Sequence, residues 1–209
     1  GSKLKTTPKA VYLEDVLEFC NFTKENRPYL EAGVCLQGLA GLQLLEALRL
    51  TWDKVDLDNG LIEISGEVKN EYRNRVIPVC SRVQEALASV KASQRRGSRY
   101  VCIGRKGRPF IDNTSYGMII TKTIKEWKSE YPWAPKDLRN CLPTFAAMNG
   151  LGGSAWEQYI GHAPRTVTDR HYIPRLASKT SGESNALERQ VKLFQMHVLE
   201  PLETEICNF

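Results

Sequence analysis

Three residues whose side chains could carry phosphate chemistry follow one another at fixed spacing in the second half of the chain. Arg139 ends the run Lys136-Asp-Leu-Arg139, Gly161-His162 brings a histidine 23 positions later, and Tyr172 follows after ten more residues. A guanidinium binds phosphate oxygens, an imidazole exchanges protons, and a tyrosine hydroxyl can become a nucleophile. Taken singly, Tyr172 is most simply an amphipathic surface residue and His162 a hydrogen-bonded structural histidine. Only the ordered set favours one shared site.

A second stretch of interest lies in the first third of the chain, as the run Ala40-Gly-Leu-Gln-Leu-Leu-Glu-Ala-Leu-Arg-Leu-Thr-Trp-Asp-Lys-Val-Asp-Leu57. Gln43 and Glu46 are two of its polar members, and Lys69 follows in a polar turn between two alternating segments. Taken alone, Glu46 is a helix partner for Arg49 three residues on. Lys69 alone is a hairpin lysine that discourages edge-to-edge pairing.

Together the two stretches resemble the conserved boxes of the tyrosine recombinases, the phage integrase family. The first box of that family runs Gly-Leu-Arg, two residues, Glu, then Leu and Trp-x-x-(Val/Ile)-Asp. Its second box runs His-x-Leu-Arg, a helix, Leu-Gly-His, and a Tyr nine or ten residues on. The resemblance spans roughly Tyr12–Tyr172. One box alone is a weak signal, but the ordered set with these spacings is specific.

The resemblance implies cleavage and rejoining of DNA strands. In the family a tyrosine hydroxyl attacks a DNA phosphodiester, forms a 3′-phosphotyrosyl link and releases a 5′ hydroxyl, so no metal or other cofactor is expected. Matched position by position, Tyr172 corresponds to the nucleophile, Arg139 to the second arginine and His162 to the histidine of the Gly-His box. Lys69 corresponds to the mobile acid that protonates the leaving oxygen, and Glu46 to the acidic residue that braces the site.

Two positions depart from the family pattern. Gln43 stands where the first-box arginine is expected, and Lys136 where the second box opens with histidine. Gln43 donates hydrogen bonds without bringing charge, and losing one preorganised donor typically costs roughly 10²–10³ in rate. Lys136 keeps a cation but cannot act as a neutral base. Arg49 lies about 600° of helix rotation past Gln43, so it is predicted to face the opposite side and not to replace it.

These departures leave more than one function open. The first hypothesis is a recombinase catalytic domain that cleaves and rejoins duplex DNA. The second is a non-catalytic DNA-binding descendant that regulates or scaffolds recombination. A relaxing enzyme similar to type IB topoisomerases shares the chemistry but has no support in the flanking sequence. The residues do not indicate the target sequence, nor whether the reaction is integration or excision.

Basic residues are concentrated in one segment. Lys91–Arg108 holds seven basic residues and no acidic ones, whereas the rest of the chain holds 22 basic and 24 acidic residues. A local positive field of this kind suits duplex DNA, although charge alone is equally compatible with a solvated loop. With the Lys69–Arg75 turn, this segment is predicted to form a DNA-contacting surface that includes Arg73, Arg75, Arg95, Arg96, Arg99, Arg105, Lys106 and Arg108.

The elements that must position these residues are predicted to be mainly helical with one small antiparallel sheet, an α+β fold. Apolar spacing predicts a helix over Tyr12–Asn26 and a core helix over about Pro28–Leu50. Asp58-Asn59-Gly60 predicts a tight turn. Strands are predicted over Leu61–Ser65 and Arg75–Val79, and further helices over Val83–Val90, Thr114–Glu130, Ala155–Ile160, Thr166–Tyr172 and near the C-terminus.

Pro143 makes a sharper prediction about the helix that follows Arg139. Proline is tolerated in the first turn of a helix but not in its interior. The helix should therefore begin near Asn140 or Cys141 and not at Lys136. Arg139 would then lie at a helix N-terminus, where backbone amides and the helix dipole also favour phosphate.

The chain is predicted to divide into three parts. Gly1-Ser2 is typical of an expression-tag remnant, so residues 1–10 are predicted as tag and linker, 11–176 as the catalytic domain, and 177–209 as a linker with a last helix. That helix carries Leu187, Val191, Phe194 and Val198 on one face. We expect it to dock on a neighbouring protomer on DNA, although packing on its own domain is the simpler alternative.

The cysteines and the hydropathy indicate the compartment. Six widely spaced cysteines without a CxxC pair favour buried free thiols in a reducing cytoplasm over a disulfide or zinc framework. No apolar run approaches the roughly 20 residues needed to cross a bilayer, so a membrane partner is not expected.

Overall fold

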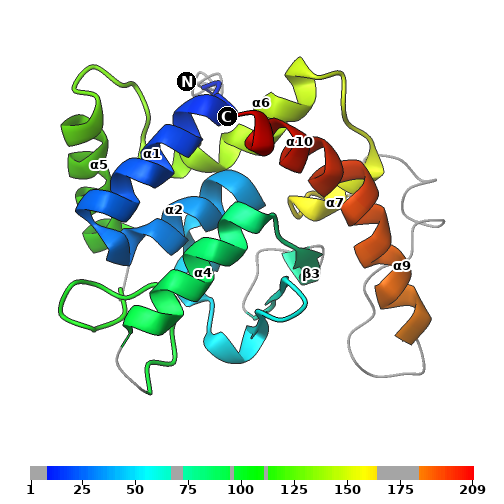
Figure 1. Cartoon of the computed structure of the whole chain (residues 1–209), viewed down its shortest axis with the longest axis horizontal. Coiled ribbons are helices and arrows are strands. Elements are labelled where there is room, and N and C mark those ends of the chain that lie inside the picture. Colours follow the sequence, from blue (N-terminus) through cyan, green and yellow to red (C-terminus); the bar gives the residue numbers. More distant parts are fainter. Residues whose placement is uncertain (1–8, 67–72, 95–96, 111–112, 164–183) are drawn as a thin grey trace, which may run out of the picture.

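The computed structural model describes residues 9–66, 73–94, 97–110, 113–163 and 184–209, and this part of the chain is mainly helical with one small sheet (Figure 1). The α+β prediction is confirmed. No described helix is long and apolar enough to cross a membrane. In chain order the elements are α1 (Leu13–Asn26), α2 (Pro28–Ala40), α3 (Leu44–Arg49), η1 (Trp52–Lys54), β1 (Val55–Asp56), β2 (Leu61–Ile64), β3 (Arg75–Pro78), α4 (Ser81–Ser93), α5 (Asn113–Trp127), η3 (Pro135–Asn140), α6 (Cys141–Met148), α7 (Ser154–Tyr159), α9 (Ser184–Phe194), η4 (Gln195–Leu199) and α10 (Glu200–Asn208).

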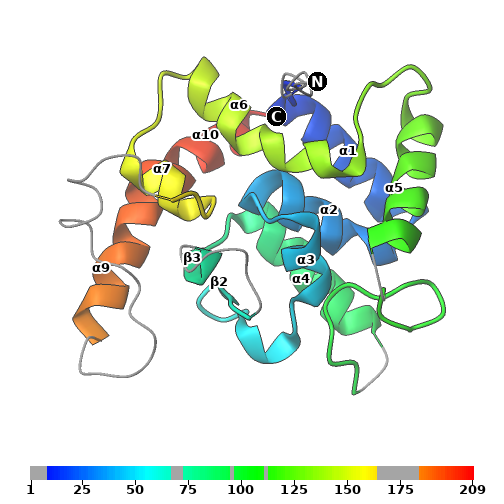
Figure 2. The ribbon, with the colours of Figure 1, turned by 180° about the vertical axis from the view of Figure 1, so that it is seen from behind.

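Helix α2 forms the centre of the core. Pro28 occupies its first turn, where a missing backbone N–H costs nothing, and eleven of its thirteen residues are buried. Helices α1, α4 and α6 pack around it (Figures 1 and 2). Gly38 allows α1 to approach closely, because a Cβ there would lie 2.5 Å from Cγ1 of Val16. A helix buried on nearly all sides has no solvent-facing polar side, so its sequence is mostly apolar, and Glu31 and Gln37 are its buried polar residues.

The prediction of a single helix over Pro28–Leu50 is wrong, because this stretch forms two helices, α2 and α3. Gly41 adopts a left-handed φ of 67° and caps α2, a conformation that glycine adopts without strain. A Cβ on Gly41 would lie 3.1 Å from Cγ2 of Ile160 and 3.2 Å from Cδ1 of Leu142. The break therefore brings the first box against the second. Apolar spacing could not reveal it, since Leu42 stays fully buried across the break.

The sheet has three antiparallel strands in the order β1-β2-β3. The predicted tight turn is confirmed: it joins β1 to β2 and ends at Gly60, whose φ is 61°. Strands β2 and β3 also match their predicted segments, with Ile64 paired to Arg75 and Leu61 paired to Pro78. Most of the polar turn predicted between these two strands, including Lys69, lies outside the described residues. The register places Arg75 at the start of β3, at the edge of that turn.

The start of α6 follows the prediction from Pro143. Residues Pro135–Asn140 form the 3₁₀ helix η3, and the α-helix begins at Cys141, so Pro143 falls in its first turn. Arg139 therefore lies two residues before the N-terminus of α6. At the start of η3, the Asp137 carboxylate accepts a hydrogen bond of 2.8 Å from the backbone N–H of Ala134 and fixes the entry into the helix.

Of the last three elements, α9 lies on the side of the molecule away from α5, and α10 runs from there back toward the middle (Figures 1 and 2). Their apolar face packs on the chain's own body: Phe194, Val198 and Leu202 are buried, and the Phe194 ring meets the Tyr159 ring edge-on at 5.5 Å. Ser81 at the start of α4 donates two hydrogen bonds to the Glu203 carboxylate. This is the simpler of the two arrangements considered above, and docking on a neighbouring protomer stays a prediction.

Candidate active site

One buried carboxylate, that of Glu46, joins the first box to the sheet. Its Oε1 accepts hydrogen bonds from Nη1 of Arg73 at 3.2 Å and Nη1 of Arg75 at 3.3 Å. Its Oε2 accepts from Nη2 of Arg75 at 3.3 Å and from the backbone N–H of Gln43 at 2.9 Å. Burial by itself would raise the pKa of Glu46, but Arg75, the Gln43 amide and Arg73 outweigh burial and hold that pKa below its ordinary value. Glu46 thus has the geometry of a brace.

Arg75 connects this brace to the Gly-His box. Its Nε donates to the backbone carbonyl of Tyr159 at 2.8 Å, and its Nη1 also donates to the carbonyl of Arg73 at 2.8 Å. Gly161 lies against the guanidinium, since a Cβ there would be 2.7 Å from Nη1, and its φ of 74° also requires glycine. The sequence predicts Arg75 on a DNA-contacting surface. In the structure its side chain is only 3% exposed, because these partners hold it inward.

Arg139 completes a cluster of charges around Glu46. Its guanidinium is half-buried and donates no hydrogen bond to a described residue. Burial lowers the pKa of Arg139, and the positive charge of Arg73 and then that of Arg75 lower it further, while Glu46 opposes them. Arg73, Arg75, Arg139 and Glu46 are called the arginine cluster below. With three guanidinium groups and one carboxylate, its described members carry a net positive charge, and it suits an anion with several oxygens.

His162 follows Gly161 directly and is oriented by an acid. Nδ1 of His162 lies 2.7 Å from Oε2 of Glu157 in α7, and the backbone N–H of His162 donates to the Glu157 carbonyl at 2.8 Å. A hydrogen bond at one ring nitrogen fixes the orientation of the imidazole and leaves Nε2 for a second partner. Sequence reasoning missed Glu157, although an acid five residues before the histidine was the available signal.

The remaining predicted residues divide between the surface and the undescribed segments. Lys136, which replaces the second-box histidine, is exposed and makes no ion pair within the described residues. Lys69, Arg95, Arg96 and Tyr172 lie outside the described residues, as does the whole of the predicted Thr166–Tyr172 helix. The exposed members of the predicted DNA surface are Arg99, Arg105, Lys106 and Arg108. Arg73 is not among them, because it belongs to the arginine cluster.

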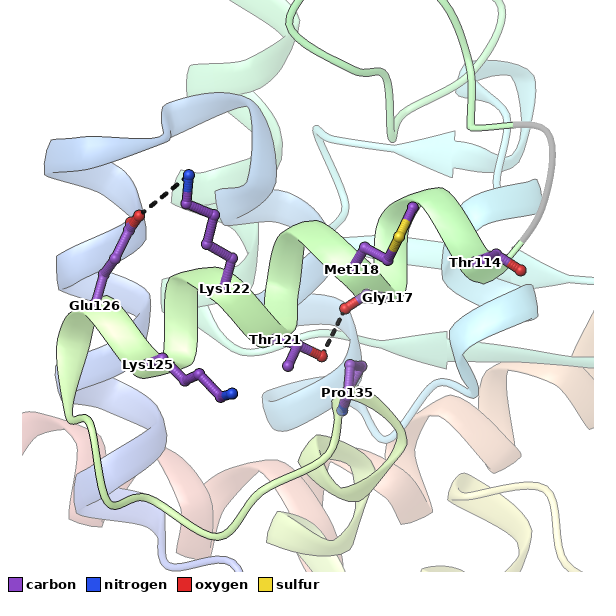
Figure 3. Close-up of a pocket in the computed structure, with 8 residues that line it drawn as sticks. All are labelled: Thr114, Gly117, Met118, Thr121, Lys122, Lys125, Glu126 and Pro135. Carbon is purple, nitrogen blue, oxygen red and sulfur yellow. Dashed lines mark hydrogen bonds and ion pairs between the residues drawn. The ribbon is translucent and has the colours of Figure 1, made fainter.

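A groove of about 710 Å³ lies elsewhere, between α5 and the residue that opens η3 (Figure 3). Lys125 and Thr121 project from α5 toward Pro135, while the Lys122 ammonium lies 3.9 Å from the Glu126 carboxylate. None of the predicted catalytic residues lines this groove. Size alone therefore does not identify the candidate site, whereas the convergence of charged side chains does.

The chain is similar in sequence to curated tyrosine recombinases. The chain is 25% identical over 177 residues to tyrosine recombinase XerD of Halalkalibacterium halodurans, an alignment that covers 78% of this chain and 56% of that protein. It is 26% identical over 165 residues to tyrosine recombinase XerA of Thermococcus kodakarensis, covering 78% and 57%. The chain thus spans a little over half the length of these curated relatives.

Solved structures share the fold. A crystal structure of XerA recombinase superposes with a TM-score of 0.63 at 18% identity, covering 95% of this chain and 66% of that one. The Tn1549 transposon integrase, solved in complex with transposon right-end DNA, superposes with a TM-score of 0.67 at 16% identity, covering 92% and 67%. The sequence profile of the phage integrase family matches residues 9–178, which include both boxes and the whole arginine cluster. The chain belongs to the phage integrase family.

Proposed function

We propose that this chain is the catalytic domain of a site-specific recombinase that cleaves and rejoins duplex DNA through a 3′-phosphotyrosyl intermediate. The observation that carries the proposal is the arginine cluster. Arg139 and Arg73 present guanidinium donors that no described residue occupies, beside a carboxylate that fixes their neighbours. A phosphodiester carries its charge on two non-bridging oxygens, and guanidinium groups match that geometry and charge.

Each proposed catalytic residue has a defined task. The Tyr172 hydroxyl attacks phosphorus, its proton leaves to a base or water, and the bond from phosphorus to the 5′ oxygen breaks as the phosphotyrosyl bond forms. Lys69 gives a proton to the departing 5′ oxygen. The Arg139 guanidinium stabilises the charge that develops on the phosphorane oxygens. His162, held by Glu157, offers its second ring nitrogen to the same phosphate. Attack by a 5′ hydroxyl reverses the steps and releases the tyrosine.

The surface proposed to hold the duplex lies on the segment between α4 and α5. Arg99, Arg105, Lys106 and Arg108 are exposed there, and Lys91 lies over the Trp52 ring at 4.3 Å, close to the first box. Contacts from such residues go mainly to phosphates and position the duplex without reading its sequence. Affinity for duplex DNA should therefore fall steeply as salt rises. The DNA complexes of the transposon and lambda integrases, which share the fold, support a DNA partner.

The boundaries and setting form part of the same proposal. Residues 11–176 would be the catalytic domain, and 177–209 a linker with the terminal helices. A recombinase of this type works on chromosomal or mobile-element DNA in the cytoplasm. On DNA, we propose that α9, η4 and α10 exchange onto a neighbouring protomer, so that the surface of β3 and α7 that they cover here receives the same elements of another copy. Light scattering that finds only monomer, with and without duplex, would count against this exchange.

Covalent capture tests the proposed reaction without knowledge of the target site. Duplexes carrying a randomised segment and a nick are incubated with the protein, and complexes that survive detergent are recovered and sequenced. The nick lets the short cleaved strand diffuse away, so a phosphotyrosyl product accumulates. Tyr172→Phe should abolish the product. Tyr159→Phe is the matched control, because Tyr159 is buried, donates to the Pro78 carbonyl at 2.9 Å, and has a pKa well raised by burial.

A non-catalytic DNA-binding role is the second candidate, and the two family departures favour it. Gln43 brings no charge to the first box, and Lys136 is exposed and offers no neutral base. Salt-dependent duplex binding without any detergent-resistant product would support this role. A product that disappears in Tyr172→Phe would exclude it.

A further inference from the structure

The structure offers a replacement for the arginine that position 43 lacks. Gln43 starts α3 as its N-cap, and its backbone N–H donates to the Glu46 carboxylate at 2.9 Å. The same carboxylate accepts a hydrogen bond from Arg73, which arrives 27 residues later along the chain from the approach to β3. The Glu46 carboxylate therefore accepts hydrogen bonds both from the backbone of Gln43 and from the guanidinium of Arg73. A cation is present beside Gln43 although the first box does not encode one.

Arg73 also has donors to spare. Its side chain is only 11% exposed, and Nη1 binds Glu46 at 3.2 Å, but its buried Nε–H has no hydrogen-bond partner among the described residues. Leaving a buried donor unsatisfied costs about 1–3 kcal/mol. Such a cost is understandable where a ligand supplies the acceptor. A phosphate oxygen entering the arginine cluster would accept a hydrogen bond from the Nε–H of Arg73, and its negative charge would complement the net positive charge of the cluster.

The other nearby arginines do not fit this task. All three guanidinium nitrogens of Arg75 already donate to Glu46 or to backbone carbonyls. Arg49 ends α3 on the exposed surface. The helical rotation predicted between Gln43 and Arg49 is wrong, because Gln43 precedes α3 as its N-cap, but the exposure of Arg49 still places it outside the arginine cluster. Burial lowers the pKa of Arg139, and among the neighbouring charges that of Arg73 lowers it most.

We propose that Arg73 is a catalytic residue that supplies the phosphate-binding charge absent at Gln43, and that it acts together with Arg139 on one phosphate. This inference rests on the proposed strand-cleavage function. Two guanidinium groups repel each other when no anion is bound. A phosphate with one or two negative charges, bound by both groups, offsets that repulsion. The first-box arginine of the family has thus moved in sequence, while its charge stays beside Glu46.

The decisive test is a rescue by the residue that the family pattern expects. Arg73→Gln should slow formation of the phosphotyrosyl product, on the captured duplex, by roughly 10²–10³-fold, the usual effect of losing one preorganised donor. Adding Gln43→Arg to that variant should restore most of the rate, because the new guanidinium also lies beside Glu46. Arg73→Lys should give an intermediate rate, since it keeps charge but loses the planar fork. Arg99→Gln removes an exposed arginine of the proposed DNA surface, outside the arginine cluster. It shows how much of any rate loss comes from weaker DNA binding alone.

A second measurement judges the inference even if no strand is cut. Inorganic phosphate is titrated into the full chain while the arginine Nε–H signals are followed by ¹⁵N NMR, with the Arg73 signal identified by its loss in Arg73→Lys. We expect that signal to shift on phosphate addition. An unshifted Arg73 signal would overturn the inference, as would equal rates for wild type and Arg73→Gln. Failure of wild type to form any product, with a shifted Arg73 signal, would refute strand cleavage and leave Arg73 as a phosphate ligand.

Discussion

Replacing Glu46 by glutamine keeps the shape of the side chain and removes the only carboxylate that Arg73 and Arg75 share among the described residues. Glu46 is 7% exposed, Arg75 is 3% exposed and Arg73 is 11% exposed. Both guanidinium groups would remain charged and buried in the variant. The amide oxygen of glutamine can still accept a hydrogen bond but brings no compensating charge.

The expected loss can be estimated from this burial. Removing one partner of a buried ion pair costs about 3–5 kcal/mol, mainly because the charge that remains is uncompensated. For a chain of this length, each kcal/mol lowers the melting temperature by roughly 2–4 °C, so Glu46→Gln should melt about 6–20 °C below wild type. The matched control is Glu126→Gln, which removes the partly exposed ion pairs of Glu126 to Arg27 and Lys122 and should cost no more than about 1 kcal/mol.

Urea unfolding followed by tryptophan fluorescence measures both variants at two pH values. Because the arginines hold the pKa of Glu46 below its ordinary value, its contribution is complete above the ordinary glutamate pKa and is lost as pH falls below it. The difference in the free energy of unfolding between wild type and Glu46→Gln should therefore be complete at pH 7 and shrink below about pH 4. If Glu46→Gln lowers the free energy of unfolding at pH 7 no more than Glu126→Gln does, the assignment of Glu46 as the brace is refuted.

Three further changes test other parts of the structure. Gly161→Ala should destabilise the chain more than Gly150→Ala in urea unfolding, because both glycines have a positive φ but only the Cβ at 161 would meet a guanidinium, at 2.7 Å; equal losses would argue against that close approach. Phe194→Ala should cost about 3–5 kcal/mol in the same assay, since the ring is buried, and a loss below about 1 kcal/mol would mean that the terminal helices pack loosely. A disulfide reagent at pH 8 should modify Cys207 at once and the five buried thiols only on unfolding, because burial raises the pKa of thiols such as Cys80 to about 12; a second fast thiol would contradict the burial.

Local patterns in the sequence were sufficient for most elements. Proline restricts its own backbone and that of its neighbours, so Pro143 located the start of α6 at Cys141. The Asp58-Asn59-Gly60 turn and the alternating segments around it were likewise local features. The pattern failed at Gly41, where a left-handed glycine ends α2 although the apolar spacing continues. The periodicity of apolar residues does not distinguish a glycine that caps a helix from a glycine buried inside one.

The sequence by itself determined the family, through the order and spacing of residues such as Arg139 and His162, and it determined the helical core with its small sheet. It did not determine which charges meet. Arg73 and Arg75 were predicted as DNA contacts because a basic residue in a polar turn is usually solvated, and only the sheet register carries them to Glu46, 27 and 29 positions away. Ion pairing depends on distance in space, and neither composition nor periodicity encodes that distance. The fold alone therefore decided where the charge missing at position 43 is supplied.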